Sequence, residues 1–359
     1  MLVDNKHYRS IWRDLNSNKV KIIDQKLLPH KFVIAELNNV QEARDAIKNM
    51  AVRGAPLIGI TAAYGMALAM ANNNTDKDII NAGNFLISSR PTAVNLAWAV
   101  TKVSKSLLDT TQSKRTNLAM TLADQMAEDD VETNEKIGIY GCEIIKQISE
   151  KKSDGNPVRI LTHCNAGWLA TVDIGTATAP IYQASKNNIA VSVWVDETRP
   201  RNQGAALTTW ELKHNSVEHT LIVDNAGGHL MQKGLVDIVI VGSDRTSANG
   251  DVCNKIGTYL KALAAKHNDI PFYAALPTST IDMNITNGVQ NIPIEDREHR
   301  EVTHINGVDQ NGKLISVKIC PPDTKISNPS FDVTPAELIT GIITEKGILH
   351  PNKGTLLKI

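Results

Sequence analysis

The chain has 359 residues, of which 42% are hydrophobic and 21% are charged, and this is the composition of a globular protein long enough to hold two domains. Its 38 basic and 38 acidic side chains balance, so the net charge gives no electrostatic footprint for nucleic acid or for a membrane and favours a small-molecule ligand. The first residues are charged and no segment has the length of a membrane span, which predicts a protein of the cytoplasm.

The first part of the chain is predicted to be mainly α-helical with some strand. Residues 19–37 contain two short strand-like runs joined around Pro29. Apolar residues then recur with the helical period in the segments 39–52, 62–72, 77–88, 93–108 and 116–148. Charges with Asp-Gly and Asn-Pro pairs interrupt this pattern at 151–159 and predict a linker. The first domain is therefore expected to span residues 1–150.

The second part, residues 151–359, is predicted to be an α/β domain. Apolar runs recur in it as VRILTH, IAVSVWVD, HTLIVDN, VDIVIVGSD and IPFYAALP, most of them separated by segments able to form a helix. Continuous rather than alternating apolarity is typical of strands covered on both faces, and it predicts a doubly wound parallel sheet. Ligands bind such sheets beyond the carboxyl ends of the strands, where the strand order reverses.

Polar residues stand at these strand ends. Cys164 follows the first run, Asp196 and Glu197 end the second, Asp224 ends the third and Asp244 ends the fourth. Cys164 is one of four widely spaced cysteines, which predict free thiols rather than a disulfide framework or a zinc site. A free cysteine is more often a buried structural residue. However, the Asn-Ala-Gly that follows Cys164 predicts a helix start, whose backbone N–H groups would favour a thiolate or an anionic ligand.

Asp244 ends a hydrophobic strand, and a polar, glycine-containing loop after it is expected to lead to another helix. The carboxylate has two interpretations at this position. It either caps that helix or pairs with Arg245, or it is partly desolvated, with a raised pKa that lets it donate a proton.

Three basic residues are candidates for holding a phosphate. Arg53, Arg90 and Lys255 each stand beside small residues or near a predicted helix start, whereas most lysines and arginines are solvated surface charges. Gly54 and Ala55 would let the backbone approach a ligand closely. Gly-rich nucleotide fingerprints are absent from the sequence, which argues against a dinucleotide or nucleoside triphosphate site.

Taken together, the motifs resemble one family. They are IIDQKLLP, MAVRGAPLIGITAAYG, SRPTAVNL, THCNAGWLAT, DETRPRNQGA, DNAGGHLM, VGSDRTSANGDVCNKIGTY and NPSFDVTP, in order from residue 22 to 335. This pattern is similar to that of the methylthioribose-1-phosphate isomerases of methionine salvage, and it covers nearly the whole chain.

The resemblance implies a small, mainly helical N-terminal domain followed by a Rossmann-like domain, assembled as a homodimer and working without a metal or cofactor. It implies conversion of 5-methylthioribose 1-phosphate to 5-methylthioribulose 1-phosphate, with Asp244 as general acid in ring opening and Cys164 in hydrogen transfer between C2 and C1. The implied substrate contacts are Arg53, Gly54, Ala55, Arg90, Gln203, Asn254 and Lys255.

Departures from the family pattern keep other functions open. Trp168, Asp173 and His229 replace smaller or different residues and are expected to reshape the pocket around the sugar's 5-substituent. An isomerase of 5-deoxyribose 1-phosphate, or one that serves both substrates, is therefore an alternative. The same fold also occurs in the regulatory subunits of the translation-initiation guanine-nucleotide exchange factor, which do not isomerise sugars. The paired cysteine and aspartate argue against such a regulator here.

Overall fold

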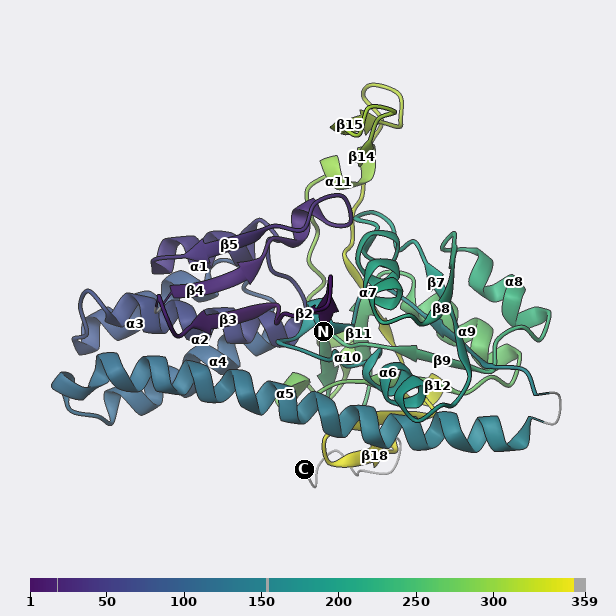
Figure 1. Cartoon of the computed structure of the whole chain (residues 1–359), viewed down its shortest axis with the longest axis horizontal. Helices are drawn as coiled ribbons and strands as arrows, with labels where there is room; N and C mark the ends of the chain where they lie inside the picture. Colours follow the sequence, from purple (N-terminus) through teal and green to yellow (C-terminus); the bar gives the residue numbers. More distant parts are fainter. Residues whose placement is uncertain (18, 153–154, 352–359) are drawn as a thin grey trace.

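The computed structural model describes residues 1–17, 19–152 and 155–351, so residues 153 and 154 of the predicted linker lie outside the described residues. Figure 1 shows two parts side by side, with a helical part around a small sheet at one end and a larger sheet with helices on both faces at the other. The long helix α5 (Gln112–Lys151) runs along both parts. In the described part of the chain, no helix combines the length and apolarity needed to cross a membrane.

The N-terminal sheet has three antiparallel strands in the order β3 (Ile11–Asp14), β4 (Lys19–Ile23) and β5 (Ile34–Leu37). The last two are the strands predicted on either side of Pro29. Strand β3 was not predicted, and a short pair, β1 (Leu2–Val3) and β2 (Lys6–His7), precedes it.

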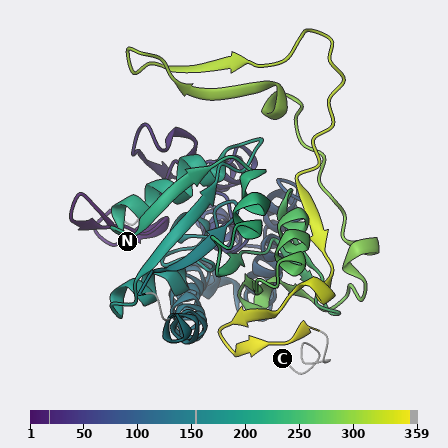
Figure 2. The same ribbon diagram turned by 90° about the vertical axis from the view of Figure 1, so that its right-hand side faces the viewer.

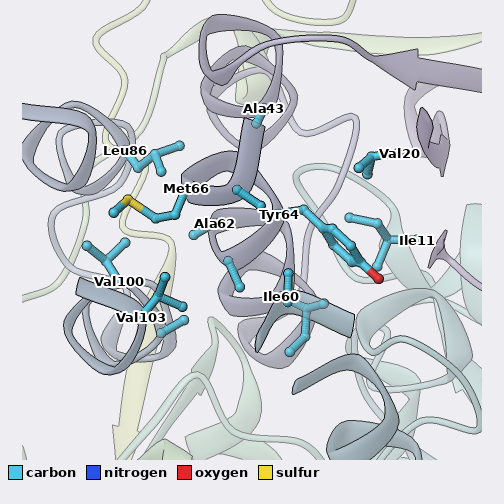
Figure 3. Close-up of a cluster of buried hydrophobic side chains, with 14 of the residues drawn as sticks. Ile11, Val20, Ala43, Ile60, Ala62, Tyr64, Met66, Leu86, Val100 and Val103 are labelled. Atoms are coloured by element: carbon cyan, nitrogen blue, oxygen red, sulfur yellow. The ribbon is translucent and has the colours of Figure 1, made fainter. Parts of the chain in front are cut away.

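Helices α1 (Val40–Lys48), α2 (Ala55–Met70), α3 (Asp76–Ile87) and α4 (Val94–Leu108) form the N-terminal core. Helix α2 is apolar on all sides, and Figure 3 shows its residues Ala62, Tyr64 and Met66 among side chains of neighbouring elements. It begins seven residues before the predicted segment 62–72, because Pro56 fits the first turn of a helix.

Helix α5 is 40 residues long and belongs to two cores. Its first half packs Ala119, Ala123 and Met126 into the N-terminal cluster. Its second half packs Ile137 and Ile145 against the large sheet. One continuous helix thus connects both cores, and the division into domains 1–150 and 151–359 stays a prediction.

The large sheet has seven strands. Their order is β18 (Gly347–Leu349), β17 (Gly341–Thr344), β12 (Phe272–Ala275), β9 (Ile238–Val241), β6 (Val158–Thr162), β7 (Val191–Asp196) and β8 (Glu218–Ile222). All neighbours are parallel except β17 and β18. Each predicted apolar run overlaps one strand of the sheet, whereas β17 and β18 were not predicted. The strand order reverses between β6 and β9.

Alternating strand residues show that helices cover both faces of this sheet. On β6, Ile160 belongs to a cluster with residues of α5 and α6 (Ala179–Lys186), whereas Leu161 belongs to a cluster with α8 (Ala226–Gln232) and α9 (Thr258–His267). The short α7 (Thr209–His214) packs its Leu212 with the first cluster. The doubly wound, Rossmann-like α/β architecture is therefore confirmed.

A second, four-stranded sheet follows Asp244. Its order is β13 (Ile281–Asp282), β10 (Arg245–Ser247), β11 (Val252–Lys255) and β16 (Phe331–Thr334). The prediction of a simple loop from Asp244 to the next helix was wrong, because a hairpin of β10 and β11 intervenes. Short helices α10 (Gly288–Asn291) and α11 (Arg300–Thr303) precede an arm formed by β14 (His304–Val308) and β15 (Leu314–Lys318), which projects from the body in Figure 2.

Candidate active site

A pocket lies beyond the carboxyl ends of β6 and β9, where the strand order reverses. It contains about 560 Å³ of empty space, part of it open to solvent. Its lining includes all nine residues predicted for the site, namely Arg53, Gly54, Ala55, Arg90, Cys164, Gln203, Asp244, Asn254 and Lys255. Residues from the helical part and from the loops of the large sheet thus share one cavity. Their individual roles stay predictions.

Cys164 stands on a tight turn directly after β6. Its φ is +66°, its N–H donates to Thr198 Oγ1 (2.9 Å) and its carbonyl accepts from Thr208 Oγ1 (2.7 Å). The predicted helix start after Cys164 was wrong. Residues 165–167 are irregular, a single 3₁₀ turn covers Trp168–Ala170, and α6 begins only at Ala179.

The irregular backbone after Cys164 determines the electrostatic environment of the thiol. The helix start predicted after Cys164 is missing, so its N–H groups do not act on the sulfur. Burial raises the pKa of Cys164, although the positive charges of Arg53 and Lys255 act in the opposite direction. The resting group is therefore a neutral thiol rather than the thiolate that a helix start would favour.

Asp244 lies opposite on the loop after β9. Its N–H donates to the carbonyl of Cys253 (2.9 Å). Burial raises the pKa of the Asp244 carboxyl, and the charges of Lys255, Arg90 and Arg53 only partly offset this effect. Asp244 does not cap a helix, because strand β10 follows it. It does not pair with Arg245 either, because Arg245 donates to the Thr92 carbonyl and lies near Asp282. The environment is that of an acid able to hold its proton.

Three buried cations surround these two groups. The exposed fractions of Arg53, Arg90 and Lys255 are only 8%, 8% and 6%, whereas such side chains are rarely buried without a partner. Burial lowers the pKa of Arg53 and of Lys255, and the nearby Cys164 and Asp244 counteract this. Buried, fixed positive charge is suited to the dianion of a phosphate monoester.

Each cation is held in place by a different partner. Arg53 donates through Nη1 to Asn165 Oδ1 and through Nη2 to the Asn165 carbonyl (2.6 Å). Arg90 Nη2 donates to Glu295 Oε2 (3.0 Å). The Lys255 ammonium lies 4.5 Å from the ring centre of Phe331. Their directions are thus set before any ligand arrives.

Gly54 and Gln203 show two further signs of a ligand site. Gly54 has φ of +98°, and a Cβ there would lie 2.5 Å from Ala170 Cα, so only glycine lets the start of α2 approach the loop of Cys164. Gln203 is 4% exposed, and its Oε1 has no hydrogen-bond partner among the described residues. A buried amide oxygen without a partner needs an explanation, and a ligand hydroxyl supplies one.

Sequence reasoning missed the group that organises the Cys164 loop. Glu211 is fully buried and accepts from the backbone N–H groups of Trp168 (2.9 Å) and Leu169 (2.8 Å), from Asn165 Nδ2 (3.0 Å) and from the Tyr182 hydroxyl (3.0 Å). Asn165 follows Cys164 directly and was available as a candidate. Glu211 gives no signal in the sequence, because its partners lie 29 to 46 residues away.

The expectation for Trp168, Asp173 and His229 was wrong, since none of them lines the pocket. Trp168 is fully buried and stacks on Trp210 at a ring distance of 5.8 Å. Asp173 is 2.7 Å from His7 Nε2, and His229 lies on α8. The apolar part of the lining comes instead from residues such as Met50, Pro277 and Phe331.

One cluster has the composition of a metal site. Ligand atoms of His163, Asp196 and Asp224 lie within 4.8 Å of one another. Protein groups already bind them, however, because the Lys261 ammonium is 2.7 Å from Asp196 and Asp224 accepts from the N–H groups of Thr198 and Arg199 (both 2.7 Å). This cluster is a network of protein hydrogen bonds and ion pairs.

Comparison with known proteins gives matches over most of the chain. A sequence model of the initiation factor 2 subunit family matches residues 51–351. A methylthioribose-1-phosphate isomerase of Brucella anthropi is 56% identical over 352 residues, which are 98% of this chain and 97% of that protein. The solved 5-methylthioribose 1-phosphate isomerase of Pyrococcus horikoshii is 39% identical, with a TM-score of 0.82 and coverage of 98% and 95%. The solved translation initiation factor eIF-2B, subunit delta, of A. fulgidus is 40% identical, with a TM-score of 0.79 and coverage of 98% and 100%.

Proposed function

The chain belongs to the initiation factor 2 subunit family. From this membership, the similar isomerases and the pocket, we propose that it is an aldose–ketose isomerase. Its reaction converts 5-methylthioribose 1-phosphate to 5-methylthioribulose 1-phosphate. One observation carries the proposal. Cys164 and Asp244 come from separate crossover loops of the large sheet and line one pocket with three buried cations.

The chemistry explains why a proton donor is needed. An aldose phosphorylated on its anomeric carbon cannot open to a free aldehyde, so the ring oxygen must take up a proton while the phosphate stays attached. Asp244 gives this proton, because burial raises its pKa and so favours the acid form. The C1–O bond of the ring then breaks and the ring oxygen becomes a hydroxyl group.

The second half of the reaction moves one hydrogen from C2 to C1, and the C2 hydroxyl group loses its proton, which returns to Asp244, so that a carbonyl is left at C2. Cys164 acts in this step in one of two ways: as a thiolate, formed by loss of the thiol proton, that takes the proton from C2 and gives it to C1, or as the resting thiol beside a direct transfer from C2 to C1. Arg53, Arg90 and Lys255 bind the phosphate, and Gln203 and Asn254 bind sugar hydroxyls. The apolar lining excludes water and keeps Asp244 protonated.

We also propose the setting of this reaction. The chain works in methionine salvage as a cytoplasmic homodimer, without a cofactor, nucleic acid or membrane. Four free cysteines support a reducing compartment, and the balanced charge supports a small-molecule ligand.

The test is turnover of 5-methylthioribose, 5-deoxyribose and ribose 1-phosphates under identical conditions, compared as kcat/KM. We expect methylthioribose 1-phosphate to be turned over, and 5-deoxyribose 1-phosphate to be a poorer substrate by no more than about 200-fold, since an added apolar group is worth only about 1–3 kcal/mol. A preference for 5-deoxyribose 1-phosphate over methylthioribose 1-phosphate by more than about 200-fold would overturn the salvage assignment. If none of the three sugar phosphates is turned over, a non-catalytic regulator is favoured. The A. fulgidus protein that this chain resembles is named a translation initiation factor.

A further inference from the structure

His163 directly precedes Cys164 and is 1% exposed. Its Nδ1 lies 2.8 Å from both carboxylate oxygens of Asp196, and its Nε2 lies 2.9 Å from the carbonyl oxygen of Ile256 and 3.2 Å from that of Lys255. Within the described part of the chain, all four contacts to the ring nitrogens are therefore made by hydrogen-bond acceptors. Each nitrogen must donate, and only the imidazolium form has two N–H groups.

The surrounding charges support this protonation state. Asp196 on β7 bonds the ring, Asp224 after β8 lies within reach of it, and Asp332 on β16 interacts with it electrostatically. The positive charge of the Lys261 ammonium on α9, 2.7 Å from Asp196, partly offsets these carboxyl groups. Burial by itself would raise the pKa of Asp196, but the charges of His163 and Lys261 lower it to about 2. Asp196 is thus an ionised carboxylate, which accepts a hydrogen bond from the ring.

The position of the ring connects two parts of the active site. Through Nδ1 it is tied to Asp196, which also accepts from Thr198 Oγ1 (2.7 Å), and Thr198 in turn accepts the N–H of Cys164 (2.9 Å). Through Nε2 it is tied to the turn after β11, whose first carbonyl belongs to Lys255. The turn fits closely, since a Cβ on Gly257 would lie 3.3 Å from the ring.

We propose that His163 is a positioning residue that stays protonated and whose imidazolium holds the loop of the Cys164 thiol against the turn of the Lys255 ammonium. It thereby sets the distance between the thiol and the phosphate-binding cation across the bound sugar. This role rests on the proposed isomerase function, whereas the protonation state does not.

The protonation state is tested on the substrate-free protein by NMR with ring-¹⁵N-labelled histidine. The His163 signals are assigned by their loss in His163→Gln. We expect both ring nitrogens of His163 to carry a proton at pH 7, because each of them faces hydrogen-bond acceptors. A neutral ring with one unprotonated nitrogen at pH 7 would overturn the proposal, whether or not the chain is an isomerase.

The positioning role is tested by two variants that each keep one half of the ring's contacts. His163→Gln places a donor near the former Nε2 and can still bond the carbonyls of Lys255 and Ile256, whereas His163→Asn places a donor near the former Nδ1 and can bond only Asp196. We expect His163→Asn to lose on the order of 10²-fold in kcat/KM, because small displacements of reacting groups cost that much. His163→Gln should stay within about tenfold of the wild type, and the control His219→Asn should be unchanged.

Melting temperature separates this role from simple loss of fold. If both variants keep wild-type kinetics, or if both lose activity only in proportion to their loss of folded protein, His163 does not position the site. A wild-type chain without turnover on any of the three sugar phosphates would instead refute the isomerase function, and with it the positioning role, while leaving the NMR result to stand.

Discussion

The loops that carry Cys164 and Asp244 are held in different ways. The loop after β6, residues 163–178, is irregular, and buried side chains such as Glu211, Thr198 and Thr208 satisfy its backbone groups. Asp244, by contrast, is followed at once by β10. The backbone of β10 pairs with the antiparallel strand β11, and Arg245 lies opposite Cys253. No side chain among the described residues hydrogen-bonds the Asp244 carboxyl.

This difference has a chemical consequence. A thiol that must lie at one place is held by a buried polar network, in which every partner matters because an unsatisfied buried group is costly. A carboxyl group that must keep its proton is placed by backbone pairing and left without donors, so that burial raises its pKa. Substitutions near Cys164 should therefore lower both stability and activity, whereas those at Asp244 should lower activity without lowering stability.

Asp244→Asn is expected to have the largest effect. The amide keeps the shape of the side chain but cannot donate a proton to a ring oxygen as a carboxylic acid does, so kcat should fall by about 10²–10⁴-fold. The melting temperature at pH 8 should be unchanged or higher, because the variant removes a carboxyl group whose pKa burial raises. Steady-state kinetics and a thermal melt measure both. Asp309→Asn, on the exposed arm, is the control, and retained turnover in Asp244→Asn would remove this residue from the mechanism.

Cys164→Ser should come next, with kcat lowered on the order of 10²-fold or more and the fold intact. Serine keeps the backbone bonds to Thr198 and Thr208 but replaces the thiol by a hydroxyl group that is a far weaker acid. Cys142→Ser, a buried thiol on α5 that packs with residues of the large sheet, is the matched control and should keep its activity. Equal kcat in both variants would show that the sulfur of Cys164 takes no part in the reaction.

The same contrast explains how far the sequence predicts this molecule. Continuous apolar runs predicted the five parallel strands, and the reversal of strand order then brought Cys164 and Asp244 together, because both stand in the loops that follow the carboxyl ends of β6 and β9. The apolar part of strand β17 is only Ile342 and Ile343, between Gly341 and Thr344, so its pattern is too short to distinguish from a loop. The hairpin after Asp244 had a signal, the Asn-Gly pair at Gly250.

The path of the Cys164 loop could not be predicted from local sequence. Asn165, Ala166 and Gly167 have the composition of a helix start, but the carboxylate of Glu211 accepts the N–H groups of Trp168 and Leu169 and replaces helical hydrogen bonds. A Cβ on Gly167 would lie 1.9 Å from Glu211 Oε2, so this glycine makes room for the carboxylate. Contacts across more than 40 residues decided the local structure.

Asn165→Ala tests the network with a smaller expected effect. It removes one of the two acceptors of Arg53 and one donor to Glu211. We expect KM to rise about tenfold and unfolding to become easier by about 1–3 kcal/mol, the usual cost of an unsatisfied buried group. Kinetics and denaturant unfolding measure the two effects. Asn187→Ala, at the exposed end of α6, serves as control, and an unchanged stability in Asn165→Ala would contradict the view that this loop depends on side-chain bonds.

The smallest effect is expected at the far end of the same loop, where Asp130 of α5 accepts the N–H of Val172 (2.7 Å). Burial raises the pKa of Asp130 to about 7. The folded state therefore keeps this proton at pH values where the unfolded chain has lost it, and stability should fall as the pH rises from 4 towards and through 7. Asp130→Asn keeps an acceptor for Val172 without the charge. Between pH 5 and 8 its melting temperature should therefore fall by a few degrees less than that of the wild type, with kcat little changed.

The control is the neighbouring Asp129, which is exposed, so Asp129→Asn should follow the wild-type curve. Parallel curves for the two variants would mean that Asp130 is already ionised in the folded protein, and that the loop of Cys164 accommodates a buried charge as well as buried amides.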